Sequence, residues 1–115
     1  AKIALSKDYF SINKRDKWIT NVYSRNLTHL FRSKYDAIIS TSKSINKDNS
    51  LLNCRIDGLT KKTPDLVIID RHLEIKKNLN IFKYSKGRKI FIYTIKRDYN
   101  KIGWLKRKNI KVILE

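Results

Sequence analysis

Short apolar segments alternate with longer polar ones along the chain, and their lengths predict strands. Apolar runs lie at 37–40, 66–69, 89–95 and 110–114, and each has the length of a strand. The run at 66–69 is continuous, which is typical of a strand buried on both faces. A further short strand is expected at 2–5.

A helical period is clearest between the expected strands at 2–5 and 37–40. Tyr23, Leu27, Leu30 and Phe31 are spaced by 4, 3 and 1 residues, which places them on one face of a helix. We expect this helix to start near position 20 or 21 and to end at about position 34. A basic helix is expected at about 99–108, and the polar stretch 41–53 has room for one helical turn.

Strands that alternate with helices predict an α/β layer with substantial parallel pairing. Ligand sites in such sheets lie at the carboxyl ends of the strands. We therefore expect a site in the polar segments that follow Ser40 and Ile69.

The composition is that of a folded domain and excludes several classes of protein. Of 115 residues, 41% are hydrophobic and 32% are charged, so the chain can bury a core and is not a disordered segment. No apolar run reaches the about 20 residues of a membrane helix, and the first residues are too polar for a secretory signal. Cys54 alone cannot form a disulfide framework. We therefore expect a cytoplasmic protein.

The sequence is expected to be a piece of a longer polypeptide. It contains no methionine, and its last apolar run is followed only by Glu115. Its length suits a single domain or a part of one.

The net charge of +17 has two explanations. Clustered lysine and arginine neutralise the phosphates of nucleic acids. The basic residues here are scattered along a chain rich in Lys, Ile and Asn, which is typical of AT-rich coding sequences. We favour compositional drift. The alternative is a small basic nucleic-acid-binding module in which Trp18, Trp104 and the tyrosines stack on bases.

Several catalytic motifs are absent. The glycines Gly58, Gly87 and Gly103 form neither a P-loop nor a G-x-G-x-x-G pattern. His29 and Cys54 are isolated in the sequence, so no zinc site and no bound metal are expected. His29 is interpreted as a packing or surface residue, and Cys54 as a small buried hydrophobic residue.

The most informative residues lie in two blocks of the chain, and each has a plain structural interpretation. Trp18 can be interpreted as a hydrophobic staple at the start of a helix, and Thr20 as the N-cap of that helix. Arg32 and Arg55 can be interpreted as solvated charges. The Asp-Asn pair at 48–49 suits a turn.

The order of these residues closely resembles a known family. Trp-Ile-Thr at 18–20 is followed by an arginine twelve positions after the threonine, by Asp-Ala-Ile at 36–38 and by D-N-x-x-L-x-x-R at 48–55. This pattern resembles the reductase domain of bacterial riboflavin-biosynthesis deaminase–reductases. The resemblance implies an α/β, dihydrofolate-reductase-like sheet with flanking helices.

Two further segments carry the resemblance. Residues 2–8 are similar to the family's K-x-A-x-S-x-D-G, with Tyr9 in place of the glycine. Pro64 and residues 67–70 are similar to its P-x-R-V-V-L-D, with Leu66 in place of the arginine. Beyond position 70 the likeness rests on the order of strands and helices.

The resemblance implies NADPH-dependent reduction of 5-amino-6-(5-phosphoribosylamino)uracil, a phosphoribosylaminopyrimidine, to the ribitylamino product. In such enzymes the cofactor brings the redox chemistry, and the protein binds and orients the reactants. By position, Trp18 packs against NADPH, and Ser44 and Asp48 line its site. Asp48 is also the catalytic candidate, because a carboxylate can accept a ribose hydroxyl or move a proton. Arg71, in place of the family's small hydroxyl residue, favours the 2′-phosphate of NADPH.

The same comparison implies a substrate site formed by Thr20, Arg32, Leu52 and Arg55, with Asp16 where the family has a serine. Guanidinium groups such as those of Arg32 and Arg55 bind a sugar phosphate through paired hydrogen bonds.

The resemblance also implies the extent and the partners of the domain. Residues 1–115 correspond to the N-terminal half to two-thirds of one reductase domain, whose Gly-rich cofactor loop would lie beyond Glu115. A zinc-dependent deaminase domain is expected upstream, and the protein is expected to be a homodimer.

Geometry separates the two candidate functions. The reductase requires Trp18, Arg32, Asp48 and Arg55 at one cleft beside the sheet. The nucleic-acid-binding module requires basic residues near the carboxyl end to share a face with an aromatic side chain. Those basic residues are Lys101, Lys106, Arg107, Lys108 and Lys111.

Overall fold

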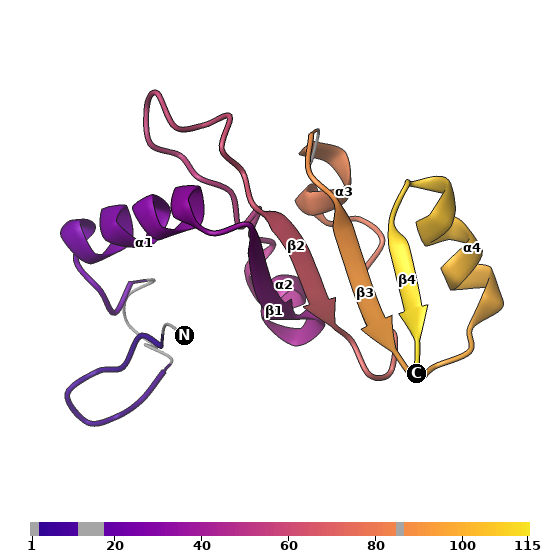
Figure 1. Ribbon diagram of the computed structural model, residues 1–115. Helices are drawn as coiled ribbons and strands as arrows, with labels where there is room; N and C mark the ends of the chain where they lie inside the picture. The colour runs from indigo at the N-terminus through magenta and orange to yellow at the C-terminus, as the bar shows by residue number, and fades with distance from the viewer. Residues whose placement is uncertain (1–2, 12–17, 85–86) are drawn as a thin grey trace.

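The computed structural model describes residues 3–11, 18–84 and 87–115, and in these ranges helices alternate with strands (Figure 1). In chain order the elements are α1 (Val22–Lys34), β1 (Ala37–Thr41), α2 (Ser42–Asp48), β2 (Asp65–Ile69), α3 (Asn80–Tyr84), β3 (Ile90–Thr94), α4 (Tyr99–Arg107) and β4 (Lys111–Leu114). The predicted α/β class is confirmed.

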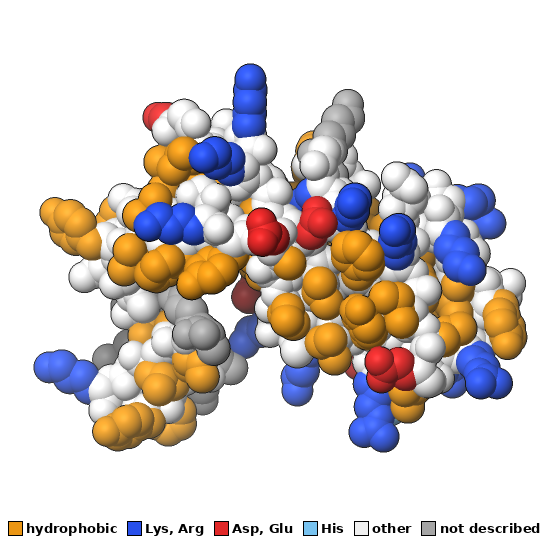
Figure 2. Space-filling model, viewed as in Figure 1, with side chains coloured by type: hydrophobic (Ala, Val, Ile, Leu, Met, Phe, Trp, Pro, Cys, Tyr) orange, Lys and Arg blue, Asp and Glu red, His pale blue; other side chains and the backbone are white. Residues whose placement is uncertain are grey.

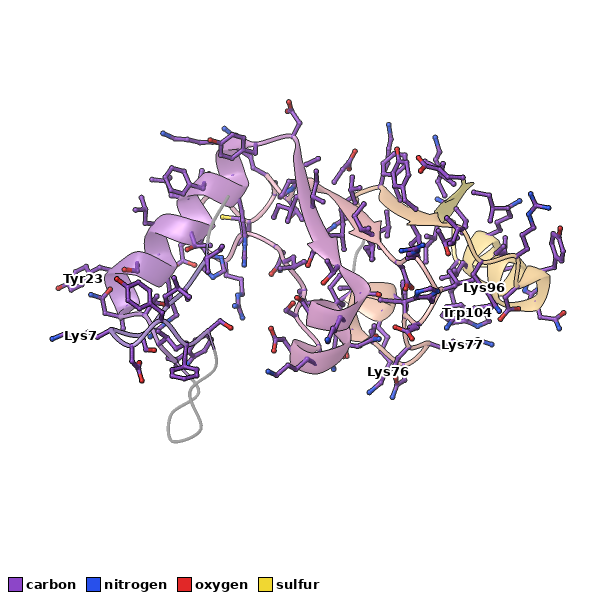
Figure 3. The ribbon with its side chains drawn as sticks, turned by 90° about the horizontal axis from the view of Figure 1, so that it is seen from below. Lys7, Tyr23, Lys76, Lys77, Lys96 and Trp104 are labelled. Carbon is purple, nitrogen blue, oxygen red and sulfur yellow. The ribbon has the colours of Figure 1, made fainter. Side chains whose placement is uncertain are left out.

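The strands form one parallel sheet whose spatial order follows the chain, β1-β2-β3-β4. Ile38 pairs with Leu66, and Leu66 pairs with Ile90, so these side chains project from the same face. The predicted parallel pairing is therefore confirmed. A parallel connection must return the chain to the same end of the sheet, and here each return contains a helix. Figures 1 and 3 show α2, α3 and α4 on one face of the sheet.

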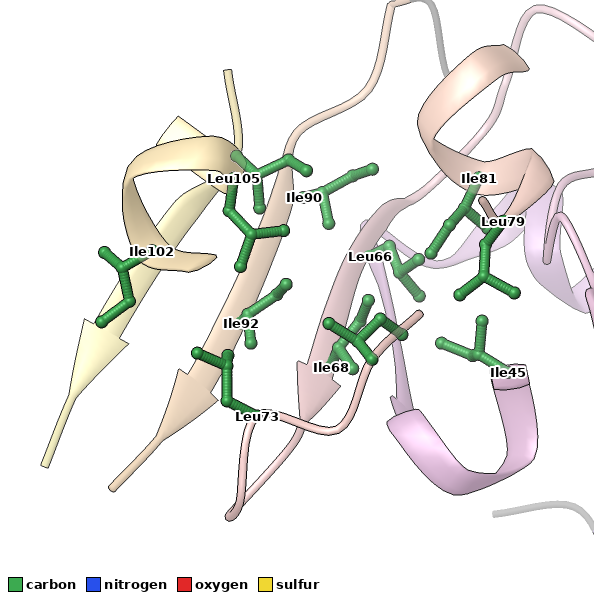
Figure 4. Packing of buried hydrophobic residues seen from close by; sticks show 12 residues of the cluster. Ile45, Leu66, Ile68, Leu73, Leu79, Ile81, Ile90, Ile92, Ile102 and Leu105 are labelled. Carbon is green, nitrogen blue, oxygen red and sulfur yellow. The ribbon is translucent and has the colours of Figure 1, made fainter. Parts of the chain in front are cut away.

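The hydrophobic core lies between that face and the three helices (Figure 4). Leu66, Ile68, Ile90 and Ile92 point into it from the two central strands. The remaining buried members are Ile45, Ile81, Ile102 and Leu105 from the helices and Leu73, Ile75, Leu79 and Ile110 from the loops. Burial of these branched aliphatic side chains is the main term that favours the folded state.

The opposite face of the sheet is not covered by any described helix. Ile39 is 72% exposed and Ile69 is 46% exposed. Figure 2, which views the molecule from this side, shows apolar side chains gathered over the strands. The prediction that 66–69 is buried on both faces is therefore wrong. Leu66 and Ile68 are buried and Ile69 is not, because the helices cover a single face.

The first helix forms where the periodicity predicts it, but its apolar face is not packed. Asn21 is the N-cap, since its side-chain oxygen accepts a hydrogen bond from the backbone N–H of Ser24 at 2.9 Å. The interpretation of Thr20 as the cap is therefore wrong. Tyr23 is 84% exposed and no residue of α1 is buried. None of the described helices is long and apolar enough to cross a membrane.

Three segments differ from the prediction. Residues 3–5 are not a strand, and the chain turns directly afterwards, where the backbone N–H of Tyr9 donates to Ser6 O at 3.0 Å. Tyr9 holds a φ of 65°, a region that glycine adopts more freely. The stretch expected to contain one helical turn holds the seven residues of α2. The helix α3 was not predicted, because a single buried apolar residue, Ile81, shows no period.

Replacing Ile92 by alanine should destabilise the protein by about 2–5 kcal/mol, because Ile92 is fully buried in the core. Ile39→Ala is the matched control, since it removes the same atoms from the exposed face of the same sheet. It should change the free energy of unfolding by less than about 0.5 kcal/mol. Urea denaturation followed by circular dichroism measures both, and equal losses would contradict this placement of the core.

Candidate functional site

A buried carboxylate joins the elements at the carboxyl ends of the strands. Asp70, directly after β2, is 2% exposed. Its Oδ1 accepts hydrogen bonds from Ser42 Oγ at 2.7 Å and from the backbone N–H of Glu74 at 2.8 Å. Its Oδ2 accepts one from the backbone N–H of Ile75 at 2.8 Å. A buried charge without such partners would be costly. Asp70 therefore fixes the first residue of α2 against the loop after β2.

Arg71 lies on that loop and is tied to the end of the next strand. Its backbone oxygen accepts hydrogen bonds from Thr94 Oγ1 at 3.1 Å and from the backbone N–H of Ile95 at 3.2 Å. The side chain of Arg71 is exposed, as are those of Lys96 and Arg97 after β3. Figure 3 views the strands from this end, where Lys96 is labelled. The carboxyl ends of β2 and β3 thus both present cationic side chains, at the edge where a ligand site is expected.

The helix α2 presents two of the predicted residues together. Ser44 and Asp48 are exposed and four residues apart, so they lie on one face. Asn46 Oδ1 accepts a hydrogen bond at 2.9 Å from the backbone N–H of Lys76, on the loop after β2, and Asn49 Oδ1 accepts one at 2.8 Å from the backbone N–H of Asn80, the first residue of α3. These contacts hold α2 in place and leave the Ser44–Asp48 face open.

A second group connects α1 to the loop that follows α2. Arg32 Nη1 donates to Asn53 O at 3.0 Å, and His29 Nδ1 lies 3.1 Å from the same oxygen. The backbone N–H of Arg55 lies 3.2 Å from His29 Nδ1. This ring nitrogen can donate to Asn53 or accept from Arg55, but it cannot do both at once. Either bond fixes the loop against α1.

Burial and the neighbouring charge of Arg55 both act on the guanidinium of Arg32. The pKa of Arg32 is lowered from its ordinary value, first by burial and then by the charge of Arg55, while Cys54 acts in the opposite direction. Cys54 is buried, as predicted. An anion bound beside Arg32 and Arg55 would offset both unfavourable effects.

A third group lies at the start of α1. The guanidinium of Arg25 lies over the ring of Trp18, 4.6 Å from its centroid, and Arg25 Nη1 donates to Thr20 O. Trp18 is 53% exposed. Arg32 is ten residues beyond Val22, the first helical residue, which corresponds to about 15 Å along the axis.

The structure therefore distributes the predicted site residues over more than one place. Arg32 and the backbone of Arg55 come together where α1 meets the loop after α2, and Leu52 lies on the same loop with its side chain against the hydrophobic core. Thr20 lies with Trp18 at the other end of α1.

The remaining predicted residues belong to the carboxyl edge of the sheet. Ser44 and Asp48 share α2, and Asp70 joins that helix to the loop of Arg71. Asp16 lies outside the described residues.

Sequence reasoning did not assign a role to Arg25 or Arg88, and it interpreted His29 as a packing or surface residue. Arg88 Nη1 donates to Leu51 O at 2.9 Å and to Leu52 O at 3.3 Å. These partners are more than thirty positions away in the chain, so no local pattern reveals them. Within the described ranges, no three His, Cys, Asp or Glu residues are grouped so as to hold a metal ion.

The arrangement that a nucleic-acid-binding module requires is only partly present. Lys111 Nζ lies 5.6 Å from the ring centroid of Phe91, its neighbour across the sheet. Trp104 instead packs edge-on against Phe82, with centroids 5.5 Å apart, and Lys77 Nζ lies 5.5 Å from its centroid. Trp104 is therefore not open as a platform for bases.

Replacing Asp70 by asparagine should destabilise the protein by about 1–3 kcal/mol. The amide nitrogen cannot accept a hydrogen bond, so one of the three donors on Asp70 is left unsatisfied in a buried place. Asp57→Asn, at an exposed loop position, removes the same charge and should have little effect. Urea denaturation measures both, and unchanged stability of Asp70→Asn would contradict the role of the carboxylate.

Known proteins are similar to this chain in sequence and in fold. The model of the RibD C-terminal domain family matches residues 9–115. The chain is 38% identical over 97 residues to a protein of Buchnera aphidicola subsp. Acyrthosiphon pisum (strain APS) named 5-amino-6-(5-phosphoribosylamino)uracil reductase, and the match covers 75% of this chain and 46% of that protein. It is 29% identical over 98 residues to the riboflavin biosynthesis protein RibD of Aquifex aeolicus (strain VF5), covering 85% of this chain and 27% of that protein.

A solved structure extends the likeness to the fold. The diaminohydroxyphosphoribosylaminopyrimidine deaminase/5-amino-6-(5-phosphoribosylamino)uracil reductase of Thermotoga maritima superposes with a TM-score of 0.70 at 22% identity. The superposition covers 98% of this chain and 37% of that one, so the chain spans less than half of each of these relatives. The match of the family model over nearly the whole chain confirms the resemblance found in the motifs, and the chain belongs to the RibD C-terminal domain family.

Proposed function

We propose that this chain is part of an enzyme that reduces 5-amino-6-(5-phosphoribosylamino)uracil with NADPH in riboflavin biosynthesis. The observation that carries the proposal is that Arg32 donates to Asn53 O on the loop that carries Arg55, whose backbone N–H lies against His29 and whose charge acts on Arg32. Membership of the RibD C-terminal domain family and the name of the Buchnera relative support it.

In this proposal, Arg32 and Arg55 bind the phosphate of the substrate. Arg32 already donates one hydrogen bond to Asn53 O, and a guanidinium has five N–H donors in all. A phosphate dianion would also offset the effects of burial and repulsion that lower the pKa of Arg32. Leu52, on the same loop, is half-buried against the hydrophobic core, and the exposed part of its side chain would supply an apolar contact to the ribosyl group.

The residues at the carboxyl edge fit a phosphorylated dinucleotide. Ser44 and Asp48 form an open polar face that suits ribose hydroxyls, and the exposed guanidinium of Arg71 suits the 2′-phosphate that distinguishes NADPH from NADH. Trp18 lies apart from this edge, at the start of α1, and its half-exposed ring is assigned to the cofactor by the resemblance to the family. When bound, NADPH supplies the hydride.

The chain's own contribution to catalysis is positioning and proton handling. The contact of α1 with the loop at Asn53 holds the substrate groups, and the Asp70 network holds the cofactor groups at the carboxyl edge of the sheet, which favours an oriented encounter. Asp48 is the residue for which a proton role is proposed, with a carboxylate oxygen that accepts a substrate hydroxyl or its proton. Thr20 and Asp16 complete the proposed substrate set.

The wider assembly is proposed on the same basis. The name of the Thermotoga protein includes a deaminase, which supports a zinc-dependent deaminase domain upstream of this chain in its parent protein. We also propose a homodimer and a cytoplasmic location.

NADPH should raise the melting temperature of the chain more than NADH does, because only NADPH offers a 2′-phosphate to Arg71. At a concentration of about 100 Kd, a ligand adds about 2.7 kcal/mol, or about 10 °C for a domain of this size. A thermal-shift titration measures this, with a short DNA duplex at two salt concentrations as control. A shift with DNA alone that collapses as salt rises would favour the nucleic-acid-binding module instead.

Arg55→Ala should weaken the binding of the phosphoribosylaminopyrimidine by about 2 kcal/mol, roughly 30-fold, because charged hydrogen bonds to phosphate are lost. NADPH binding should stay nearly unchanged. Arg107→Ala, which removes the same charge from the exposed end of α4, is the control. Titration calorimetry with each ligand gives the comparison. Equal losses for substrate and cofactor would count against a phosphate-binding role for Arg55.

A further inference from the structure

Arg88 is a half-buried cation that the proposed chemistry does not use. It precedes β3, and its Nη1 donates to two consecutive backbone oxygens, Leu51 O at 2.9 Å and Leu52 O at 3.3 Å. Hydrogen bonds from a charged donor are stronger than those between neutral groups. Arg88 therefore holds the backbone immediately before the Asn53 oxygen that Arg32 contacts.

The backbone that Arg88 holds is strained. Leu52 has a φ of 51°, in the left-handed region that residues other than glycine rarely adopt. Its side chain packs against the hydrophobic core, so glycine could not replace it without loss of that contact. Such a conformation persists only where surrounding contacts impose it. The two hydrogen bonds from Arg88 go to the backbone oxygens of the strained residue, Leu52, and of its neighbour, Leu51.

Arg88 itself is too enclosed to bind a ligand directly. Its Nε and Nη2 are buried without a hydrogen-bond partner, and its pKa is lowered to about 10, first by burial. The charge of Asp65 raises this pKa, and the charge of Arg32 lowers it. The guanidinium is therefore close enough to Arg32 to add to the positive potential there, while its hydrogen bonds go to the loop.

We propose that Arg88 is a positioning residue for the phosphate site, which it shapes by holding the loop at Leu51 and Leu52 in the conformation that places Arg55 beside Arg32. This inference rests on the proposed function, because it concerns the same phosphate site. It assigns a specific role to a residue that neither contacts the substrate nor belongs to the recognised motif.

Arg88→Met tests the role, because methionine keeps much of the apolar stem but removes the charge and the donors. The stem matters because Arg88 also lines a cavity of about 360 Å³ with Ile81 and Asn109. Arg88→Lys restores a charged donor. Lys83→Met is the matched control, since Lys83 is an exposed residue of α3 that lines the same cavity and carries the same charge.

Ribose 5-phosphate is the probe, and its Kd and that of NADPH are measured by titration calorimetry on each variant. We expect Arg88→Met to weaken ribose 5-phosphate about tenfold, with NADPH unchanged, and Arg88→Lys to recover most of the loss. Lys83→Met should bind both ligands like the unchanged chain. If Arg88→Met does not fold, as judged by circular dichroism, Arg88→Gln replaces it and should weaken the probe several-fold.

The outcomes separate this inference from the proposed function. Unchanged affinity for ribose 5-phosphate in a folded Arg88 variant would overturn the positioning role alone. Equal weakening of ribose 5-phosphate and NADPH would also overturn it, because a general loss of structure moves both. Failure of the unchanged chain to bind ribose 5-phosphate would overturn the proposed phosphate site, and the role of Arg88 with it.

Discussion

The carboxylate of Asp70 is the constraint on which the arrangement of this domain depends. All strands of a parallel sheet end on the same side, so the loops that follow them lie next to one another. Contacts other than those between the strands must fix these loops relative to one another. Asp70 does this with three accepted hydrogen bonds, one from the start of α2 and two from the loop after β2. Its charge is tolerated in the interior because each of these donors faces it.

The second constraint is the one-sided core. Because every crossover helix lies on the same face, the strands bury alternate residues. Leu66 and Ile68 are buried on the helix-covered face, and Ile39 and Ile69 stay exposed on the opposite face. The same arrangement leaves the Ser44–Asp48 face of α2 and the side chain of Arg71 at one accessible edge. The hydrophobic core thus holds the strands and helices together, while polar contacts fix the loops at the carboxyl ends of the strands.

Much of this architecture could be predicted from the sequence, and the failures have physical causes. The apolar runs predicted the positions of all four strands of the described sheet, because a strand with a buried face needs apolar residues within a short segment of the sequence. The burial of Ile69 was predicted wrongly, because a continuous apolar run does not say how many faces the helices cover. The bond from Arg88 to Leu51 was not predictable, since it joins positions far apart in the chain. The family motif implied one substrate site for Arg32 and Arg55, and in the structure Arg32 contacts the loop that carries Arg55.

The order of the strands has a consequence for how the domain is made. Because β1-β2-β3-β4 follows the chain, each new strand finds its partner already present in the segment synthesised just before it. Among the four strands of the described residues, none must wait for a distant one or insert between two that have already paired. The sheet can therefore grow one strand at a time as the polypeptide leaves the ribosome, with each helix closing over the strand it has just connected.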